Sequence, residues 1–330
     1  MLEEPDVAAS GQGVCVVIAA YRAEATIARA VSSALAQPEV AEVAVVDDAS
    51  PDGTAAAARA ADDGSGRLSV RTLPANAGPS RARNLAIDGS AAPLVALLDA
   101  DDFFLPGRLA ALLAVPDWDL VADDIAFIDE TRVDAVDLGP IAARRIPPRL
   151  LTPAGFVEGS ITRAGRHKGE LAFLKPVMRR AFLDAHRLRY DEGMRLAEDY
   201  DFYLRALLAG ARFRLADFCG YVAVERRGSL SHDHGAADLH RFERAIERGL
   251  AAAGTDPELR RHLRRHLRQT GRRRRHRALL DRKREAGLLA ALAGGWREPA
   301  GLLRALGDVA RDKLRRDAAP RRTEGVRFLL

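Results

Sequence analysis

Cysteine is scarce in this chain, and long apolar runs are missing. The two cysteines, Cys15 and Cys219, lie far apart in the sequence and form no metal-binding pattern. Cys15 sits inside a short apolar run, where a free cysteine behaves as a small buried hydrophobic residue. A reducing compartment fits this usage, because nothing in the sequence requires a disulfide.

The sequence also lacks the usual marks of export and of membrane insertion. Residues 1–13 are acidic and have neither the basic flank nor the apolar stretch of a secretory signal peptide. No uninterrupted apolar run approaches the roughly 20 residues that a helix needs to cross a bilayer. We therefore expect a cytoplasmic protein.

The charge balance hides a strong asymmetry. The chain has 51 Lys and Arg residues against 46 Asp and Glu, a formal net charge of +5 over 330 residues. The positive excess is concentrated between Glu258 and Arg322, so the rest of the chain is net acidic. A chain of this length can hold one large domain or one domain with an appendage. We interpret it as an acidic body with a basic tail.

Apolar runs alternate with helical patterns in the first third of the chain. The runs are typical of strands buried on both faces and occupy residues 14–19, 43–46, 68–73 and 95–98. Helices of about ten residues between strands imply right-handed crossovers. The sequence therefore predicts an α/β fold with a mostly parallel central sheet flanked by helices.

Later segments are predicted as a mixture of elements. Residues 120–128 are expected to form one or two strands, 198–208 a helix that Gly210 ends, 212–215 and 221–225 two short strands, and the residues after 235 helices.

One strand run ends abruptly in carboxylates. Asp99, Asp101 and Asp102 follow residues 95–98, at the edge of the sheet where ligands bind in open α/β folds. Clustered carboxylates repel one another unless solvent or a divalent cation neutralises them. We interpret the cluster as a site for Mg²⁺ or Mn²⁺ carrying a substrate phosphate. A solvated turn rich in aspartate is the alternative.

Three carboxylate sites occur at expected strand ends or helix starts. They are Asp47 with Asp48, the 99–102 cluster, and Glu198 with Asp199, and Asn76-Ala77-Gly78 and Ala82-Arg83-Asn84 lie between the first two. In this order and spacing they resemble the inverting family 2 glycosyltransferases of the GT-A fold. The resemblance covers roughly residues 14–232.

The resemblance implies a division of the chain into four segments. These are an N-terminal arm at 1–13, a nucleotide-sugar-binding half at 14–128, an acceptor-binding and catalytic-base half at 129–235, and a basic helical extension at 236–330.

The resemblance implies a UDP-sugar as donor. Asp48 would accept a hydrogen bond from the N3–H of uracil, a donor that cytosine lacks, and capping of a turn is the alternative for it and for Asp47. Tyr21 lies in the turn after the first strand, but Arg22 follows it where the family often has asparagine, which leaves the base contacts of this turn open. Arg81 or Arg83 would steady the diphosphate, with a solvated helix face as the alternative.

The 99–102 cluster would hold the metal. Asp101 is the expected direct ligand, with Asp99 a second ligand nearer the ribose. A divalent cation there would neutralise the charge on departing UDP, so that no general acid is required. Asp102 would support this shell or bind acceptor. His232 would add a metal or diphosphate contact, with a surface or capping role as the alternative.

Asp199 is the expected catalytic base. A sugar hydroxyl that attacks the anomeric carbon must lose its proton as the bond forms, and one carboxylate suffices for a single displacement with inversion. Glu198 beside it is assigned to donor binding. The alternative is that both residues only favour the start of a helix, where negative charge is stabilised.

A narrower resemblance concerns residues 169–232. Phe173-Leu174-Lys175-Pro176 and the run from Arg226 to His232 are similar to bacterial exopolysaccharide enzymes of the succinoglycan glucosyltransferase type, which implies a glucosyl donor and a lipid-linked oligosaccharide acceptor. The Gln-x-x-Arg-Trp motif of processive synthases is incomplete, because Arg273 follows Gln269 and Arg272 where the tryptophan would be. We therefore expect transfer of one sugar per acceptor.

The basic tail has several interpretations. Aromatic residues that would stack on nucleic-acid bases are absent from 260–284, so no nucleic-acid partner is expected. Leucines and Trp296 recur at roughly helical spacing from Leu288 to Leu314, which suits a helix in a membrane interface. We expect peripheral contact with the inner face of the cell membrane. A helical cap packed on the catalytic domain is the alternative.

Two other functions compete with sugar transfer. A sugar-nucleotide pyrophosphorylase is also α/β and uses metal-bound aspartates, but its phosphate-cradling loop is rich in glycine, and residues 19–24 contain none. A non-catalytic nucleic-acid-binding protein would use the tail and would leave the carboxylate sites unexplained.

Overall fold

The computed structural model describes residues 13–161, 171–226, 235–293 and 326–330. By internal contacts the chain forms two compact units. The sheet unit comprises Met1–Arg226 with Val326–Leu330, and the helical unit comprises Arg227–Gly325.

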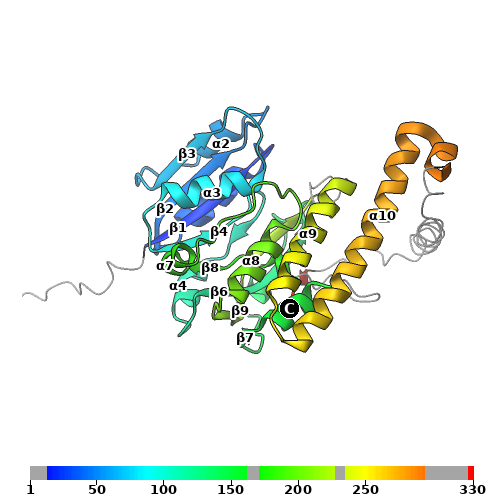
Figure 1. Cartoon of the computed structure of the whole chain (residues 1–330). Helices are drawn as coiled ribbons and strands as arrows, with labels where there is room; N and C mark the ends of the chain where they lie inside the picture. Colours follow the sequence, from blue (N-terminus) through cyan, green and yellow to red (C-terminus); the bar gives the residue numbers. More distant parts are fainter. Residues whose placement is uncertain (1–12, 162–170, 227–234, 294–325) are drawn as a thin grey trace, which may run out of the picture. The chain divides into compact units, whose positions relative to one another are not determined.

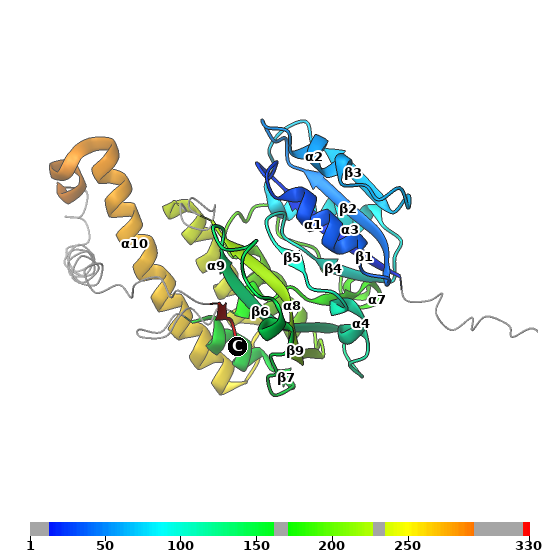
Figure 2. The same cartoon turned by 180° about the vertical axis from the view of Figure 1, so that it is seen from behind.

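The first four strands of the sheet unit pair in parallel, as the alternating pattern predicts, in the order β3-β2-β1-β4. Their bounds are β1 Val14–Ala20, β2 Val40–Asp47, β3 Leu68–Thr72 and β4 Leu94–Leu97, joined by helices α1 Ile27–Leu35, α2 Thr54–Ala60 and α3 Pro79–Gly89. Helix α3 covers one face of these strands, and α1 with α2 covers the other (Figures 1 and 2). The chain adds β2 and then β3 on one side of β1, and then crosses back to add β4 on the other side of β1. The carboxyl ends of β1 and β4 are therefore the switch point where ligands bind in such sheets.

Beyond β4 the sheet becomes mixed. Strands β8 (Val177–Arg179) and β6 (Leu120–Asp129) pair antiparallel, whereas β6 and β9 (Phe213–Glu225) pair in parallel. The full order is β3-β2-β1-β4-β8-β6-β9-β5, with β7 on β9 and β10 on β6. The parallel arrangement expected for most of the sheet thus holds for β1 to β4 and for β6 with β9. The remaining elements are β5 Phe103–Phe104, α4 Arg108–Leu113, α5 Gly139–Ala142, β7 Arg149–Leu151, α6 Pro153–Ser160, the 3-10 helix η2 Leu171–Phe173, α7 Arg180–Ala185, α8 Glu198–Leu208 and β10 Arg327–Phe328.

Strand β9 is one continuous strand, where the sequence predicts two short ones. The polar residue Asp217 and the glycine at 220 suggest a turn, but pairing between β9 and β6 continues past them. The register of this pairing shifts on either side of Asp124. Strand β10 has no counterpart among the predicted elements, because two residues carry no recognisable pattern.

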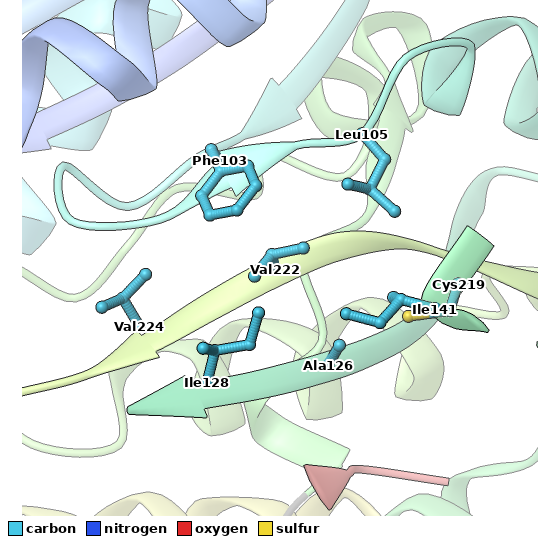
Figure 3. Packing of buried hydrophobic residues seen from close by; sticks show 8 residues of the cluster. All are labelled: Phe103, Leu105, Ala126, Ile128, Ile141, Cys219, Val222 and Val224. Atoms are coloured by element: carbon cyan, nitrogen blue, oxygen red, sulfur yellow. The ribbon is translucent and has the colours of Figure 1, made fainter. Parts of the chain in front are cut away.

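Apolar side chains of β5, β6 and β9 form a compact core cluster beside these strands. In Figure 3, Phe103 and Leu105 face Val222 of β9, and Ala126 and Ile128 come from β6. Phe328 of β10 packs against the same cluster, so residues near position 330 complete a core built mainly by residues 103–224. This core supports the loop that carries the 99–102 carboxylates, because that loop leads directly into β5.

The helical unit contains α9 (Ala236–Ala252) and α10 (Pro257–Ala293), as predicted for residues after 235. Leu239, Phe242 and Ile246 of α9 are buried, as are Leu259 and Leu263 of α10. In the described part of the chain, no helix is both long and apolar enough to span a membrane. Trp296 and the leucines that follow it lie outside the described residues.

Candidate active site

The expected donor-binding residues begin at the carboxyl ends of β1, β2 and β4. Tyr21 directly follows β1, Asp48 directly follows β2, and Asp99 comes two residues after β4. The backbone N–H of Asp48 donates to the carbonyl of Ala20, which holds the first two strand ends together. The structure thus brings these three residues to the edge of the sheet at its switch point.

Asp48 holds the turn that starts α3. Its Oδ1 accepts the backbone N–H of Ala77 at 2.7 Å, and its Oδ2 accepts that of Gly78 at 2.8 Å. Gly78 has φ of 92°, a conformation that favours glycine. The side chain is buried, and both carboxylate oxygens already accept one hydrogen bond, so any base contact must use their remaining lone pairs.

Helix α3 is tied to the segment that precedes α8. Asn84 pairs with Tyr190 in both directions, accepting its backbone N–H and donating to its carbonyl. Arg81, expected near the diphosphate, forms an exposed ion pair with Glu192 at 2.8 Å. These contacts fix the helix that carries Arg83 against the segment that leads into α8.

The centre of the site is a four-charge cluster made of Arg83, Asp99, Lys175 and Asp199. Arg83 lies 3.0 Å from Asp99 and 3.4 Å from Asp199, while Lys175 lies 3.0 Å from Asp99 and 2.8 Å from Asp199. Arg83 also pairs with Glu198 at 2.9 Å. Two buried cations therefore join Asp99 to Asp199, the expected base.

The cluster perturbs the protonation of its members. Burial raises the pKa of Asp99, but Lys175 and Arg83 outweigh burial and lower this pKa to about 2. Burial acts to lower the pKa of Lys175 and of Arg83, yet Asp199 and then Asp99 hold both above their usual values. At neutral pH both cations remain protonated, and Asp99 remains ionised.

The two oxygens of Asp199 differ in their surroundings. Oδ2 accepts the hydrogen bond from Lys175, whereas Oδ1 is buried and accepts no hydrogen bond from the described residues. A buried acceptor without a donor costs about 1–3 kcal/mol, so such an atom calls for a reason. The Tyr190 hydroxyl lies beside Asp199, and burial, then the charge of Asp199 and a side-chain interaction with it, raises the pKa of Tyr190.

Asp101 and Asp102 follow Asp99 but have other partners. Oδ2 of Asp101 accepts from Nε and Nη2 of Arg226 at 3.1 and 2.8 Å. Asp102 is buried and accepts from the Tyr221 hydroxyl at 2.7 Å and from the backbone N–H of Val224 at 2.9 Å. Burial, followed by the charges of Asp101 and Asp99, raises the pKa of Asp102. Asp102 thus anchors β9 to the loop and supports the site.

Asp99 and Asp101 are the residues that could hold a divalent cation with few protein ligands. The side chains of Asp99 and Asp101 are 33% and 26% exposed, so both are accessible. No group of three or more His, Cys, Asp or Glu residues in the described ranges could hold a metal. Mg²⁺ commonly binds through one or two carboxylates and completes its shell with substrate phosphates and water. The pair fits a cation that arrives with a diphosphate. His232 lies outside the described residues.

Sequence reasoning assigned no role to three residues of the site. Lys175 and Arg226 were noted only as parts of motifs, and Tyr221 only as part of a strand. A lysine inside the otherwise apolar run from Phe173 to Met178 was the available indication for Lys175, because buried lysines are rare without an anionic partner.

A buried ion pair supports the site from beneath. Arg108 Nη2 lies 2.7 Å from Asp123 Oδ1 and 2.6 Å from the carbonyl of Lys175, and both side chains of the pair are almost fully buried. Asp123 Oδ2 accepts the backbone N–H of Gly220, and a Cβ at Gly220 would lie 2.8 Å from Arg108. The pair therefore fixes the start of β8 and the middle of β9.

An α/β sheet with carboxylates at its switch point, cationic groups beside them and a further carboxylate at the start of α8 defines a glycosyltransferase of the GT-A fold. The chain belongs to glycosyltransferase family 2, whose model matches residues 15–143. The family resemblance seen in the sequence is thereby confirmed.

The chain is similar to exopolysaccharide proteins along most of its length. It is 49% identical over 309 residues to the succinoglycan biosynthesis protein ExoU of Rhizobium meliloti (strain 1021), covering 94% of this chain and 90% of that protein. It is 35% identical to the succinoglycan biosynthesis protein ExoO of the same organism, covering 66% of this chain and 62% of that protein. Among solved structures, S. aureus TarS in complex with UDP-GlcNAc shares the fold, with a TM-score of 0.61 and 20% identity over 90% of this chain and 80% of that one.

Proposed function

We propose that this enzyme transfers a single sugar, glucose, with inversion from a UDP-sugar to a lipid-linked oligosaccharide acceptor in exopolysaccharide synthesis. The observation that carries the proposal is the four-charge cluster, in which Arg83 and Lys175 each contact both Asp99 and Asp199. The 49% identity to a succinoglycan biosynthesis protein supports the exopolysaccharide assignment.

The proposed reaction is one displacement at the anomeric carbon. The acceptor hydroxyl gives its proton to Asp199, its oxygen forms a bond to the anomeric carbon, and the bond to the diphosphate breaks with the electron pair leaving on UDP. Entry and departure on opposite faces invert the anomeric centre. Glu198 and Arg83 hold the start of α8 so that Asp199 faces the acceptor.

Donor binding is assigned to the strand ends. Tyr21 and Asp48 would contact the base, Asp99 would lie toward the ribose, and Asp99 with Asp101 would hold Mg²⁺ or Mn²⁺. A cation bound there supplies Lewis-acid stabilisation of the diphosphate leaving group. Arg226 holds Oδ2 of Asp101, and Arg83 with Lys175 holds both oxygens of Asp99. A bound cation would share these carboxylates with the basic side chains or displace them, and a displaced Arg226 would be free to pair with a phosphate oxygen.

A panel of UDP-sugars tests this proposal. Wild-type protein with Mn²⁺ and a lipid-linked oligosaccharide should release UDP from UDP-glucose faster than from the other donors, and chelation should stop release. Asp199→Asn should abolish transfer and keep UDP binding, because the amide is isosteric but accepts no proton. Absence of UDP release with every donor, or unchanged turnover in Asp199→Asn, contradicts the proposal.

The helical unit is proposed to contact anionic lipid. Five exposed arginines lie along α10 between positions 264 and 273. We name them the arginine stripe: Arg264, Arg265, Arg268, Arg272 and Arg273. Basic side chains near an anionic leaflet contribute about 1 kcal/mol each, so five give appreciable binding.

Vesicle sedimentation tests the lipid contact. The protein should bind phosphatidylglycerol vesicles but not phosphatidylcholine vesicles, and binding should weaken as salt rises. Replacing the arginine stripe by glutamine should abolish binding. The control replaces five exposed arginines of the sheet unit by glutamine and should leave vesicle binding intact; they are Arg59, Arg71, Arg145, Arg149 and Arg187. Equal loss in both variants, or tight binding of RNA instead of vesicles, contradicts the proposal.

A further inference from the structure

The position of Lys175 suggests more than charge balance. Its side chain is buried, and its ammonium group bonds one oxygen of each of two carboxylates that lie 100 positions apart in the sequence, Asp99 and Asp199. Burying an ammonium group is costly unless it is paired and hydrogen-bonded. Arg83 already pairs with both carboxylates, so charge neutralisation alone does not explain a second buried cation at this position.

The hydrogen-bond pattern around Asp199 indicates a role for this second cation. Lys175 engages Oδ2 at 2.8 Å, while Oδ1 accepts no hydrogen bond within the described part of the chain and has Arg83 Nη1 at 3.4 Å. A carboxylate held at one oxygen cannot rotate freely, so the other oxygen keeps a constant orientation. Lys175 therefore holds the carboxylate in one orientation, with the Arg83 guanidinium beside its other oxygen.

We propose that Lys175 is a positioning residue that holds the Asp199 carboxylate by Oδ2 and so fixes its orientation for taking the acceptor proton. The inference rests on the proposed function, in which Asp199 is the base. In the transfer step the acceptor O–H proton moves to the Asp199 carboxylate, while Lys175 stays bonded to that carboxylate. Lys175 itself neither gains nor loses a proton.

The backbone of Lys175 is fixed for this task. Its carbonyl accepts from Arg108 at 2.6 Å, and Arg108 is held by the buried Asp123. The carbonyl of the preceding Leu174 accepts from the Tyr203 hydroxyl at 2.8 Å, and Tyr203 belongs to the helix that carries Asp199. Hydrogen bonds thus fix the backbone around Lys175 to Arg108 and to the helix that carries Asp199. Neutralising a charge would not require the lysine backbone to be fixed in this way.

The test separates turnover from binding in the full-length protein. Turnover is UDP release from UDP-glucose with Mn²⁺ and a lipid-linked oligosaccharide, and binding is calorimetry with UDP and Mn²⁺. Lys175→Met should lower kcat by about 10²-fold, the usual loss when a reacting group is misplaced by about 1 Å. UDP binding should be unchanged or tighter, because Asp99 loses a competing cation, and KM should stay the same.

Further variants keep the proposal falsifiable if Lys175→Met folds poorly. Lys175→Arg, which retains a charged donor, should recover at least about tenfold of the lost kcat, and Lys175→Gln should recover less, because a neutral donor holds a carboxylate more weakly. Arg180→Met is the matched control. Arg180 is a partly buried cation next to β8 whose side chain bonds, among the described residues, the backbone carbonyls of Ala92 and Ile87, and its loss should leave kcat intact.

Three results would overturn the inference. These are wild-type kcat in Lys175→Met, parallel loss of kcat and of UDP binding, and equal rates in Lys175→Arg and Lys175→Met. Asp199→Asn distinguishes this failure from failure of the proposed function. If Asp199→Asn is inactive while Lys175→Met turns over normally, the base assignment stands and only the role of Lys175 falls.

Discussion

The hydroxyl of Tyr221 donates to Asp102 at 2.7 Å and accepts the backbone N–H of Asp99 at 3.1 Å. One buried oxygen on β9 therefore joins both ends of the 99–102 loop. The Tyr221 ring also packs edge-on against Phe104, 5.8 Å between centroids. The loop that carries the expected metal ligands depends on a strand more than 100 positions away in the sequence.

Tyr221→Phe should destabilise the sheet unit by about 1–3 kcal/mol, because it leaves Asp102 and the Asp99 N–H without their partner in a buried site. The ring contact with Phe104 is retained, so the loss reports the hydroxyl alone. Urea denaturation measures the stability, and calorimetry with UDP and Mn²⁺ measures the binding, which should weaken as the loop loosens. Unchanged stability and binding would show that the hydroxyl does not hold the loop.

Gly220→Ala should cost about 1–3 kcal/mol through overpacking. The added Cβ would lie 2.8 Å from Cγ of Arg108 and 3.1 Å from Oδ2 of Asp123, two groups already locked in a buried ion pair. Gly89→Ala provides the matched control, because nothing lies within 4 Å of its Cβ position, and it should leave stability unchanged or slightly raised. Similar midpoints of urea unfolding for the two variants would refute this account of the 108–123 pair.

Asp101→Asn should weaken UDP binding in the presence of Mn²⁺ by at least about tenfold and leave metal-free UDP binding unchanged, because an amide oxygen is a poorer ligand for a hard cation than a carboxylate. Asp88→Asn removes the same charge at an exposed ion pair with Arg189 and serves as the control. Equal affinities for Mn²⁺ and UDP in Asp101→Asn and wild type would exclude Asp101 as a metal ligand.

The helical unit should lose stability as the pH falls from about 6.5 to about 4. Burial, with a smaller contribution from Arg273, lowers the pKa of His266 from 6.5 to about 4. In this window the unfolded state binds a proton that the folded state excludes, so stability is full above 6.5 and declines below it, by at most about 3 kcal/mol.

Hydrogen exchange of α9 and α10 amides across this pH range, corrected for intrinsic exchange rates, measures the effect. His266→Leu should remove most of the pH dependence, because Leu fills the space beside Phe242 without a titratable group. His240→Gln is the control at an exposed histidine and should retain it. A pH dependence that persists unchanged in His266→Leu would assign it to another group.

Local patterns in the sequence were sufficient for the family and for much of the fold. Valine-rich runs at 14–19 and 43–46 became β1 and β2, and Pro79 does begin α3. They succeeded because buried parallel strands and helix starts are recognisable over a few residues. Strand β9 was predicted as two strands and β10 was missed, because pairing with β6 decides both and lies outside any local window.

The sequence by itself determined which groups stand at the strand ends and the start of α8: Asp48, Asp99, Asp101, Glu198 and Asp199. Only the tertiary structure decided their partners, because an ion pair such as Arg83 with Glu198 joins residues 115 positions apart in the sequence. In the folded chain, Asp48 accepts hydrogen bonds from the backbone of residues 77–78, and Asp101 pairs with Arg226. Lys175 lies between Asp99 and Asp199 and pairs with both. The sequence shows which side chains can ionise or bind a metal. Which of them pair in a buried site depends on the distances between their atoms, and the tertiary structure sets those distances.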